Sequence, residues 1–261
     1  DSDSVTVDVN NAGTASGENN AGTLGGLTVD DAEDVTVNTA DFDQTNLGGF
    51  SGTSAETLTI NASSDTAFGG FTGSSDLTEI DAGGSDSEVD VGTLSSVDRA
   101  LEFTGSSGKD IVGNGNVGNA ASSPVTQTFD LGEGADEFTL ADVNDANGNL
   151  TVNGGAGNDT FIVTPPANDT LATGSSVGNS IAIDGGDGDQ DALEISGDID
   201  SGSTNSSTIT LDSFGGIEEV TLDVEDSASA NAEDFTLNLG VGNNFDDSVS
   251  FTNVADLAGS A

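Results

Sequence analysis

The stretch Gly154–Phe161, with the sequence GGAGNDTF, matches the pattern G-G-x-G-x-D-x-φ at every fixed position, where φ is an apolar residue. Its glycines allow the left-handed backbone of a turn that points main-chain carbonyl groups inward. Asp159 adds a carboxylate, and Phe161 begins a strand and anchors it in a core. Because calcium takes about six to eight oxygen ligands, the stretch predicts a calcium-binding turn of a β-repeat fold.

Related turns surround this stretch. Their sequences are LGEGADEF (131–138), GSSGKDIV (105–112) and DGGDGDQDAL (184–193), with the degenerate AGGSDSEV (82–89) and GVGNNFDD (240–247). The first keeps its aspartate as Asp136. The second keeps Asp110, although the preceding Lys109 conflicts mildly with a cation site unless it points outward. The third shifts its aspartate and leaves Asp189 or Asp191 as the equivalent. The alternative is that these stretches are ordinary hairpin turns whose aspartates are solvated.

The charge of the chain favours bound cations. Asp and Glu number 47 against 2 Lys and Arg, a net charge of −45, and the two cations are Arg99 and Lys109. Unpaired carboxylates repel one another, and compaction strengthens the repulsion. The chain is therefore either disordered or held together by cations from solution, and its recurring short apolar runs favour order. The solvated acidic surface of a halophile is a rival explanation of the charge, compatible with calcium binding.

The residue types that the sequence lacks limit the metals that it can bind and the reactions that it could catalyse. The sequence has no Cys, His, Met, Trp or Tyr. Hard cations, calcium above all, therefore fit its oxygen ligands, whereas zinc, iron and copper do not. With two basic residues nucleic acid is not expected as a partner, and no apolar run is long enough to insert into a membrane. No imidazole activates a nucleophile, so only a carboxylate pair could act in catalysis, and an enzyme is not expected.

Short apolar-x-apolar pairs recur along the chain and predict an all-β fold, a parallel β-solenoid with glycine–aspartate turns. The pairs are Val35/Val37, Leu58/Ile60, Leu101/Phe103, Phe129/Leu131, Leu150/Val152, Ile181/Ile183, Ile209/Leu211, Val220/Leu222 and Phe235/Leu237. Neighbouring pairs mostly lie about 20–30 residues apart, as the coils of a solenoid do. Helix signals are nearly absent, because glycine, asparagine, aspartate, serine and threonine punctuate the chain.

A local repeat supports one core-facing strand in each coil. It reads AEDVTVN at 32–38, AETLTIN at 55–61, IEEVTLD at 217–223 and AEDFTLN at 232–238. Its central apolar–Thr–apolar sequence places two side chains on one face and threonine on the other. The alternative to a purely structural role of these strands is a flat threonine ladder that binds ice or polysaccharide, but the threonines form no long regular array.

Three regions and several loops follow from this pattern. Residues 1–98 are predicted to be β-repeats with degenerate turns, 99–200 the calcium-binding solenoid, and 201–261 C-terminal repeats of the same solenoid. Loops are expected at 11–26, 113–124, 164–180 and 198–208. The chain begins with Asp1-Ser2-Asp3 instead of a signal peptide or Met, so we expect a processed protein or a fragment.

The turns resemble those of the repeats-in-toxin family of type I secreted bacterial proteins, and of bacterial surface-layer proteins like that of Caulobacter. The matching stretch is roughly 101–222, and it closes with FGGIEEV at 214–220, which is similar to an element that follows such turns in that family. The resemblance implies a right-handed parallel β-solenoid with calcium between stacked turns. Toxin-type arrays use tandem nonapeptides, whereas these turns are about 20–30 residues apart, so each coil is wider.

The resemblance also implies the metal ligands. The sixth motif position carries the calcium-binding aspartate, with neighbouring oxygens and glycines completing the site. The candidate residues are Asp110, Asp136, Asp159, Asp187, Asp189, Asp191 and Asn158, with Gly132, Gly134, Gly155 and Gly157 supplying backbone room and carbonyl groups.

The expected function is that of a calcium-stabilised structural protein on the bacterial cell surface, exported by type I secretion. It would self-assemble into a surface layer, sheath or filament, with cell-surface polysaccharide as a further candidate partner. The alternative is a calcium-dependent adhesin or glycan-binding module of a larger type I secreted protein. Carbohydrate sites usually show aromatic platforms, and here the only aromatic residues are 12 phenylalanines.

Overall fold

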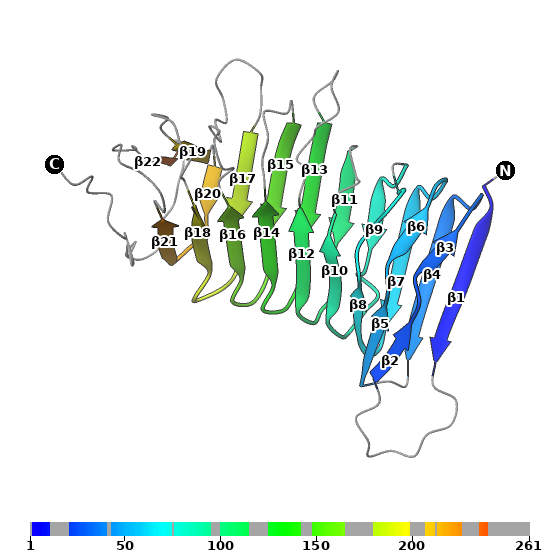
Figure 1. The fold of residues 1–261 in the computed structure, drawn as a ribbon. Helices are drawn as coiled ribbons and strands as arrows, with labels where there is room; N and C mark the ends of the chain where they lie inside the picture. The colour runs from blue at the N-terminus through cyan, green and yellow to red at the C-terminus, as the bar shows by residue number, and fades with distance from the viewer. Residues whose placement is uncertain are drawn as a thin grey trace.

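The computed structural model describes residues 2–10, 21–40, 43–74, 76–94, 100–114, 125–141, 148–164, 180–198, 207–211, 213–225 and 235–239. In these residues every regular element is a β-strand, and no helix is long and apolar enough to cross a membrane. Strand pairing is parallel throughout, and the chain winds as a β-solenoid whose strands stack side by side (Figure 1). The fold predicted from the sequence is confirmed.

Two nine-stranded parallel sheets form the walls of the solenoid. Sheet A contains β1 (Ser4–Asn10), β4 (Asp34–Ala40), β7 (Thr57–Ala62), β9 (Glu79–Asp81), β11 (Leu101–Thr104), β13 (Val125–Asp130), β15 (Gly148–Asn153), β17 (Ser180–Asp184) and β20 (Ser213–Gly215). Sheet B contains β2 (Ala21–Leu24), β5 (Gln44–Leu47), β8 (Asp65–Phe68), β10 (Val89–Thr93), β12 (Asp110–Asn114), β14 (Glu137–Ala141), β16 (Thr160–Thr164), β18 (Ala192–Asp198) and β21 (Glu219–Glu225).

Two smaller parallel pairs complete the described strands. They are β3 (Leu27–Val29) with β6 (Phe50–Gly52), and β19 (Ser207–Leu211) with β22 (Phe235–Leu239). The repeat found in the sequence is distributed over the solenoid: its first two copies are the paired strands β4 and β7, and the last two contribute β21 and β22.

The core is a stack of apolar side chains between the two sheets. On sheet A, Phe103 pairs with Phe129, and Phe129 with Val152. The rings of Phe129 and Phe138, one from each sheet, lie 5.0 Å apart in an edge-to-face arrangement. Both are fully buried, and burial of such a side chain contributes about 1.5–3 kcal/mol. Alternation along each strand thus places one face in the core, as the apolar-x-apolar pairs predict.

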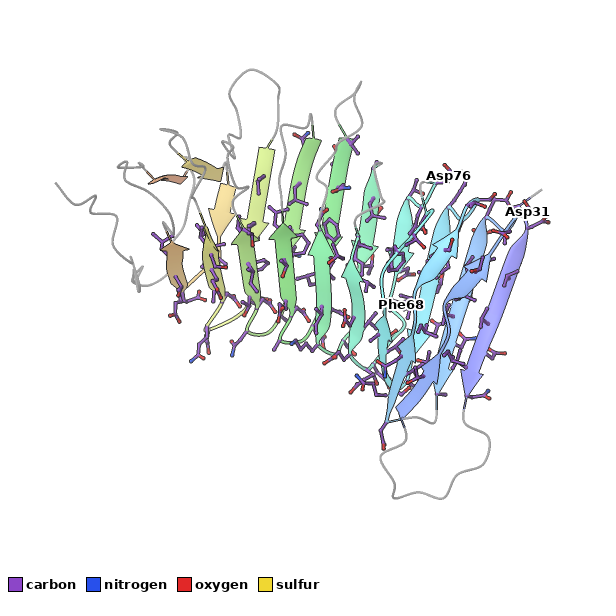
Figure 2. The ribbon with its side chains drawn as sticks, in the orientation of Figure 1. Asp31, Phe68 and Asp76 are labelled. Atoms are coloured by element: carbon purple, nitrogen blue, oxygen red, sulfur yellow. The ribbon has the colours of Figure 1, made fainter. Side chains whose placement is uncertain are left out.

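The same packing continues into the N-terminal coils. Phe68, labelled in Figure 2, is buried and its ring lies 5.7 Å from that of Phe71. On the outer face of sheet A, Thr6, Thr36 and Thr59 are in register, and Asp81 takes the next position. The threonine array is therefore interrupted after three coils.

The glycine–aspartate turns that the structure describes lie at the same corner, where the chain passes from a strand of sheet A to the next strand of sheet B; the degenerate turn predicted at 240–247 lies outside the described residues. Residues 105–109, 131–136, 154–159 and 185–191 connect β11 to β12, β13 to β14, β15 to β16 and β17 to β18. Because the coils stack in register, each turn lies directly on the next one, as the bridge between Glu133 and Ala156 shows. Stacking brings equivalent residues of successive turns within hydrogen-bonding distance.

Candidate functional site

Four aspartates form a buried row along the turn corner, one from each of four successive coils. They are Asp110, Asp136, Asp159 and Asp191, and we call them the aspartate row. Each precedes or begins a strand of sheet B, and at most 1% of each residue is exposed. Buried carboxylates are rare unless they are paired or coordinate a metal, so a row of four requires a specific explanation.

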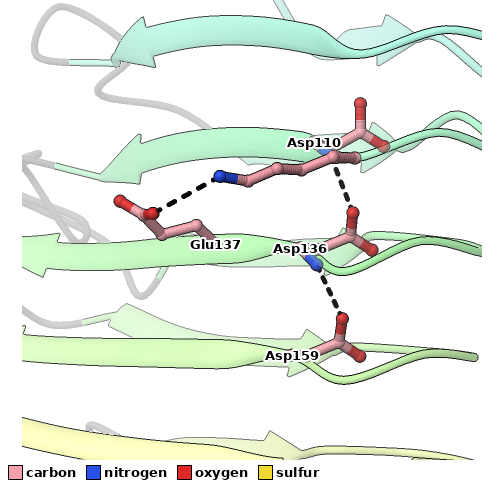
Figure 3. A network of polar contacts seen from close by, with 5 residues as sticks. Asp110, Asp136, Glu137 and Asp159 are labelled. Atoms are coloured by element: carbon pink, nitrogen blue, oxygen red, sulfur yellow. Dashed lines mark hydrogen bonds and ion pairs between the residues drawn. The ribbon is translucent and has the colours of Figure 1, made fainter.

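Hydrogen bonds between coils position these side chains. The main-chain N–H of Asp110 donates to Oδ1 of Asp136 at 2.7 Å, and that of Asp136 donates to Oδ1 of Asp159 at 2.8 Å (Figure 3). The N–H of Asp159 donates in turn to Oδ1 of Asp191 at 2.7 Å. The bonded residues are 23 to 32 positions apart in the chain, so only the stacking of coils brings them together. One oxygen of each acceptor carboxylate is thereby satisfied.

The second oxygen of these acceptors has no partner. Oδ2 of Asp136, Asp159 and Asp191 is buried and makes no hydrogen bond. An unpartnered buried charge costs several kcal/mol, so each oxygen requires either a proton or a cation. At Asp110, by contrast, Oδ2 accepts the N–H of Ser106 at 2.6 Å and Oδ1 accepts its hydroxyl at 3.1 Å. The N-terminal end of the row is therefore closed by protein groups.

Main-chain carbonyl oxygens of the stacked turns lie close to the unpartnered oxygens. A Cβ atom on Gly154 would overlap both Oδ2 of Asp159 and the carbonyl oxygen of Gly185 in the next coil. A Cβ atom on Gly157, whose φ is +141°, would overlap the carbonyl oxygen of Gly134. Glycine is required here because the oxygens of two coils approach the space that a side chain would fill.

Burial changes the ionisation of the row. It raises the pKa of Asp136 to about 8, with a further contribution from the neighbouring carboxylates of Asp110 and Asp159. It raises the pKa of Asp110 to about 7, against hydrogen bonds from Ser106 that lower it, and the pKa of Asp159 to about 6. The pKa of Asp191 is also raised by burial, and by the charges of Glu218 and Asp184. Without a counterion, Asp136 and part of the Asp110 population retain a proton near neutral pH.

The oxygen set fits a hard cation and no other common metal. In the described part of the chain, no three carboxylate, imidazole or thiol groups converge on one point. A bound ion would therefore draw its ligands from carboxylates of adjacent coils together with glycine carbonyl groups. Calcium accepts such mixed sets of carboxylate and carbonyl oxygens.

The other candidate residues lie around the row. Asp187 and Asp189 are exposed, so of the two alternatives in that turn, Asp191 is the one in the row. Asn158 is exposed as well, and its Oδ1 accepts the N–H of Asp189 at 3.4 Å.

The four candidate glycines all have backbone conformations that L-residues rarely adopt. The φ angles are +99° at Gly132, +145° at Gly134, +97° at Gly155 and +141° at Gly157. These positions therefore require glycine for the turn itself, whether or not a metal is bound.

Lys109 points away from the row. Its Nζ lies 3.8 Å from Oε2 of Glu137, and both side chains are about 40% exposed, at 40% and 38%. An exposed pair of this kind contributes little to stability, up to about 1 kcal/mol. The lysine next to Asp110 therefore does not fill the space in front of the carboxylates.

The sequence patterns did not show which residues stand beyond the two ends of the aspartate row. Towards the N-terminus the same inward positions are held by Thr45, Thr66 and Val89, which pair in register with one another and with Asp110. Towards the C-terminus the main-chain N–H of Asp191 donates to Oε2 of Glu218 at 2.7 Å. The degenerate turn at 82–89 thus lacks a carboxylate at the row position, and FGGIEEV contains one.

Comparison of the chain with protein-family models, with curated proteins and with solved structures found no match in any of the three.

Proposed function

We propose that this chain is a calcium-stabilised structural protein of the bacterial cell surface, which self-assembles into a surface layer, sheath or filament. The observation that carries the calcium part is the set of unpartnered, buried Oδ2 atoms of Asp136, Asp159 and Asp191. Calcium would be held by these carboxylates and by glycine carbonyl groups of the stacked turns, and it would supply the positive charge that the chain lacks. The family resemblance of the turns agrees with this proposal.

The charge of the whole chain supports the same conclusion. A net charge of −45 opposes compaction, and two basic residues cannot offset it. Ions bound only by the folded state stabilise it by mass action, by about 3–4 kcal/mol per site at 100 to 1,000 times the dissociation constant. Millimolar calcium outside cells suits sites of moderate affinity. Extracellular location, with type I secretion, is therefore part of the proposal.

The self-assembly part is supported by the N-terminal end of the solenoid. The large hydrophobic side chains exposed in the described residues are Val5, at 37%, and Leu24, at 42%, and both belong to this end. Leu24 lines a hollow of about 320 Å³ together with Val7, Val9 and Leu27, among others. Among the described strands, β1 pairs with β4 alone, which leaves its other edge open for hydrogen bonding. A second copy of the chain stacked on this end would cover both the apolar surface and the edge.

Chelation tests this function. We expect excess EDTA to lower the melting temperature, followed by the β-sheet circular dichroism signal, and to disperse any assemblies seen by electron microscopy, and calcium, but not equimolar magnesium, to restore both. Magnesium is the matched control, because it prefers a smaller octahedral shell and keeps its water molecules. A melting temperature that EDTA does not lower, together with unchanged particles, would refute the proposal.

An adhesin or glycan-binding module is the second candidate. A hollow of about 350 Å³ on the outside of sheet A, lined by Thr78, Glu79, Glu102, Thr126 and Thr128 among others, offers polar groups to a saccharide. The phenylalanines whose side chains are described are buried, so none of them provides a stacking platform there. A glycan array probed with the calcium-loaded protein tests this candidate, and the absence of any bound glycan would exclude it.

A further inference from the structure

Glu218 occupies the next position of the aspartate row, although it belongs to no glycine–aspartate motif. Strands β18 and β21 pair in register with Ala192 opposite Glu219, which places Asp191 opposite Glu218. The N–H of Asp191 donates to Oε2 of Glu218 at 2.7 Å, as each N–H within the row donates to the aspartate of the next coil. Glu218 therefore replaces an aspartate in the same pattern of hydrogen bonds.

Oxygens of the last two coils that the structure describes at this corner approach the same point. Oδ2 of Asp191, a fully buried residue, makes no hydrogen bond. A Cβ atom placed on Gly185 would lie 2.8 Å from that Oδ2 and would overlap the carbonyl oxygen of Gly216. The unpartnered carboxylate oxygen and the glycine carbonyl of the next coil thus approach the same small space, as Asp159 and Gly185 do one coil earlier.

The length of the turn explains why a glutamate stands here. Asp184 pairs with Gly215, and Asp191 bonds to Glu218, so the turn from Gly215 to Glu218 is shorter than the turn on which it stacks. The short turn places Ile217, 1% exposed, in the core. An additional methylene group lets the glutamate reach the line of the row from this backbone.

We propose that Glu218 is the last cation ligand of the row in the described part of the chain, so that a hard divalent cation, calcium, is held between the coils of β18 and β21 by Asp191, Glu218 and the carbonyl oxygen of Gly216. This inference rests on the proposed calcium function and extends it to a segment outside the aspartate motifs. Within the described residues the row then ends with a metal ligand towards the C-terminus, whereas Ser106 closes its N-terminal end with hydrogen bonds.

A purely structural role is the alternative, in which Glu218 only accepts the N–H of Asp191. The variant Glu218→Gln separates the two roles, because glutamine keeps a side-chain oxygen for that hydrogen bond and loses the charge. Glu219→Gln is the matched control: it removes the same charge from the adjacent residue, whose side chain is exposed on the outer face. The full chain is used for both variants, and calcium alone is the probe.

The measurements are the number of calcium ions bound per chain, by equilibrium dialysis with elemental analysis, and the melting temperature with calcium and with EDTA. We expect Glu218→Gln to bind one ion fewer, or to bind it at least about tenfold more weakly. Even the loss of an outer-shell partner of a metal ligand typically lowers metal affinity by about that factor, and Glu218 is proposed as a ligand itself. Its calcium-dependent rise in melting temperature should shrink, while its melting temperature in EDTA stays near that of the wild type. Glu219→Gln should match the wild type throughout.

Three different results would overturn the inference. If the wild type binds calcium and Glu218→Gln binds it with the number and affinity of Glu219→Gln, then Glu218 is not a ligand, although the proposed function stands. If the wild type binds no calcium at all, the proposed function fails and the inference fails with it. A Glu218→Gln protein that does not fold in EDTA, where the wild type and Glu219→Gln do fold, shows a structural role and also contradicts the inference.

Discussion

The main-chain N–H of Asp136 donates to Oδ1 of Asp159 at 2.8 Å, although 23 residues separate them in the chain. The bond joins two coils at the corner of the solenoid and fixes which carboxylate oxygen remains free. Oδ1 of Asp159 accepts a hydrogen bond from the backbone of the neighbouring coil, and Oδ2 has no partner. Because one carboxylate oxygen accepts a hydrogen bond between coils and the other has no partner, the row is both a structural element and a candidate ion site.

Replacing Asp159 by Asn should separate these two roles. The asparagine oxygen can still accept the N–H of Asp136, but the buried negative charge is gone. In EDTA the variant should be at least as stable as the wild type, because it no longer buries an unpartnered carboxylate. In saturating calcium it should be less stable by about 3–4 kcal/mol, the contribution of one well-occupied site. Chemical denaturation with and without calcium measures both effects.

Asp189→Asn is the control for this prediction. Asp189 lies at the same corner but is exposed, so the same chemical change should leave calcium binding within experimental error. Equal effects of the two variants would show that the calcium effect is one of total charge and not of the row.

The metal-free protein should lose stability as the pH rises. Burial raises the pKa to about 6 at Asp159, about 7 at Asp110 and about 8 at Asp136, whereas an unfolded aspartate titrates near 3.9. The folded state then binds more protons than the unfolded state. The contribution of these carboxyl groups to the free energy of unfolding is therefore fully present below about pH 4 and is lost as the pH rises through the folded pKa values. Between pH 5 and pH 8 we expect a loss on the order of a few kcal/mol.

Denaturation in EDTA at several pH values tests this dependence. The chain has no histidine or cysteine, and of the other described carboxylates that of Glu88 has a pKa raised by partial burial. The row should therefore dominate the slope in this range, and Asp159→Asn should reduce it. Saturating calcium should reverse the slope, because calcium requires ionised carboxylates. Stability in EDTA that is flat or rises between pH 5 and pH 8 would contradict the prediction.

Gly154→Ala should destabilise the fold in the presence and in the absence of calcium. A Cβ atom there would overlap Oδ2 of Asp159 and the carbonyl oxygen of Gly185, and backbone must move to make room for it. We expect a loss of about 1–3 kcal/mol or more, measured by thermal or urea denaturation. Gly25→Ala is the matched control, because a Cβ on Gly25 has no neighbour within 4 Å. If both variants unfold alike, the turn is less tightly packed than the structure shows.

The double variant Val5→Thr with Leu24→Gln should weaken self-association. Both side chains are exposed at the N-terminal end of the solenoid, and the changes replace apolar by polar surface. Sedimentation velocity in calcium should show smaller species than the wild type at equal concentration. The melting temperature of the dilute protein should change little, since neither residue is in the core. Assemblies of unchanged size would place the contact between copies elsewhere.

The amino-acid sequence by itself determined the local features of this protein. Apolar residues alternating with polar ones, as at Leu150 and Val152, make a strand with one face for a core, whatever its neighbours are. The glycines at 154, 155 and 157 impose a turn directly after that strand, because their backbone angles or close approaches exclude side chains. The solenoid and the corner that holds the turns could therefore be predicted.

Only the tertiary structure decided which carboxylates meet. Asp189 and Asp191 lie one residue before and one residue after the motif position, and the register with the coil before it places Asp191 inward. Glu218 enters the row because a shorter turn stacks on Asp191, and Val89 takes the equivalent place beside Asp110. The physical reason is that the row is held by hydrogen bonds between residues 23 to 32 positions apart, and such bonds exist only once the coils are stacked.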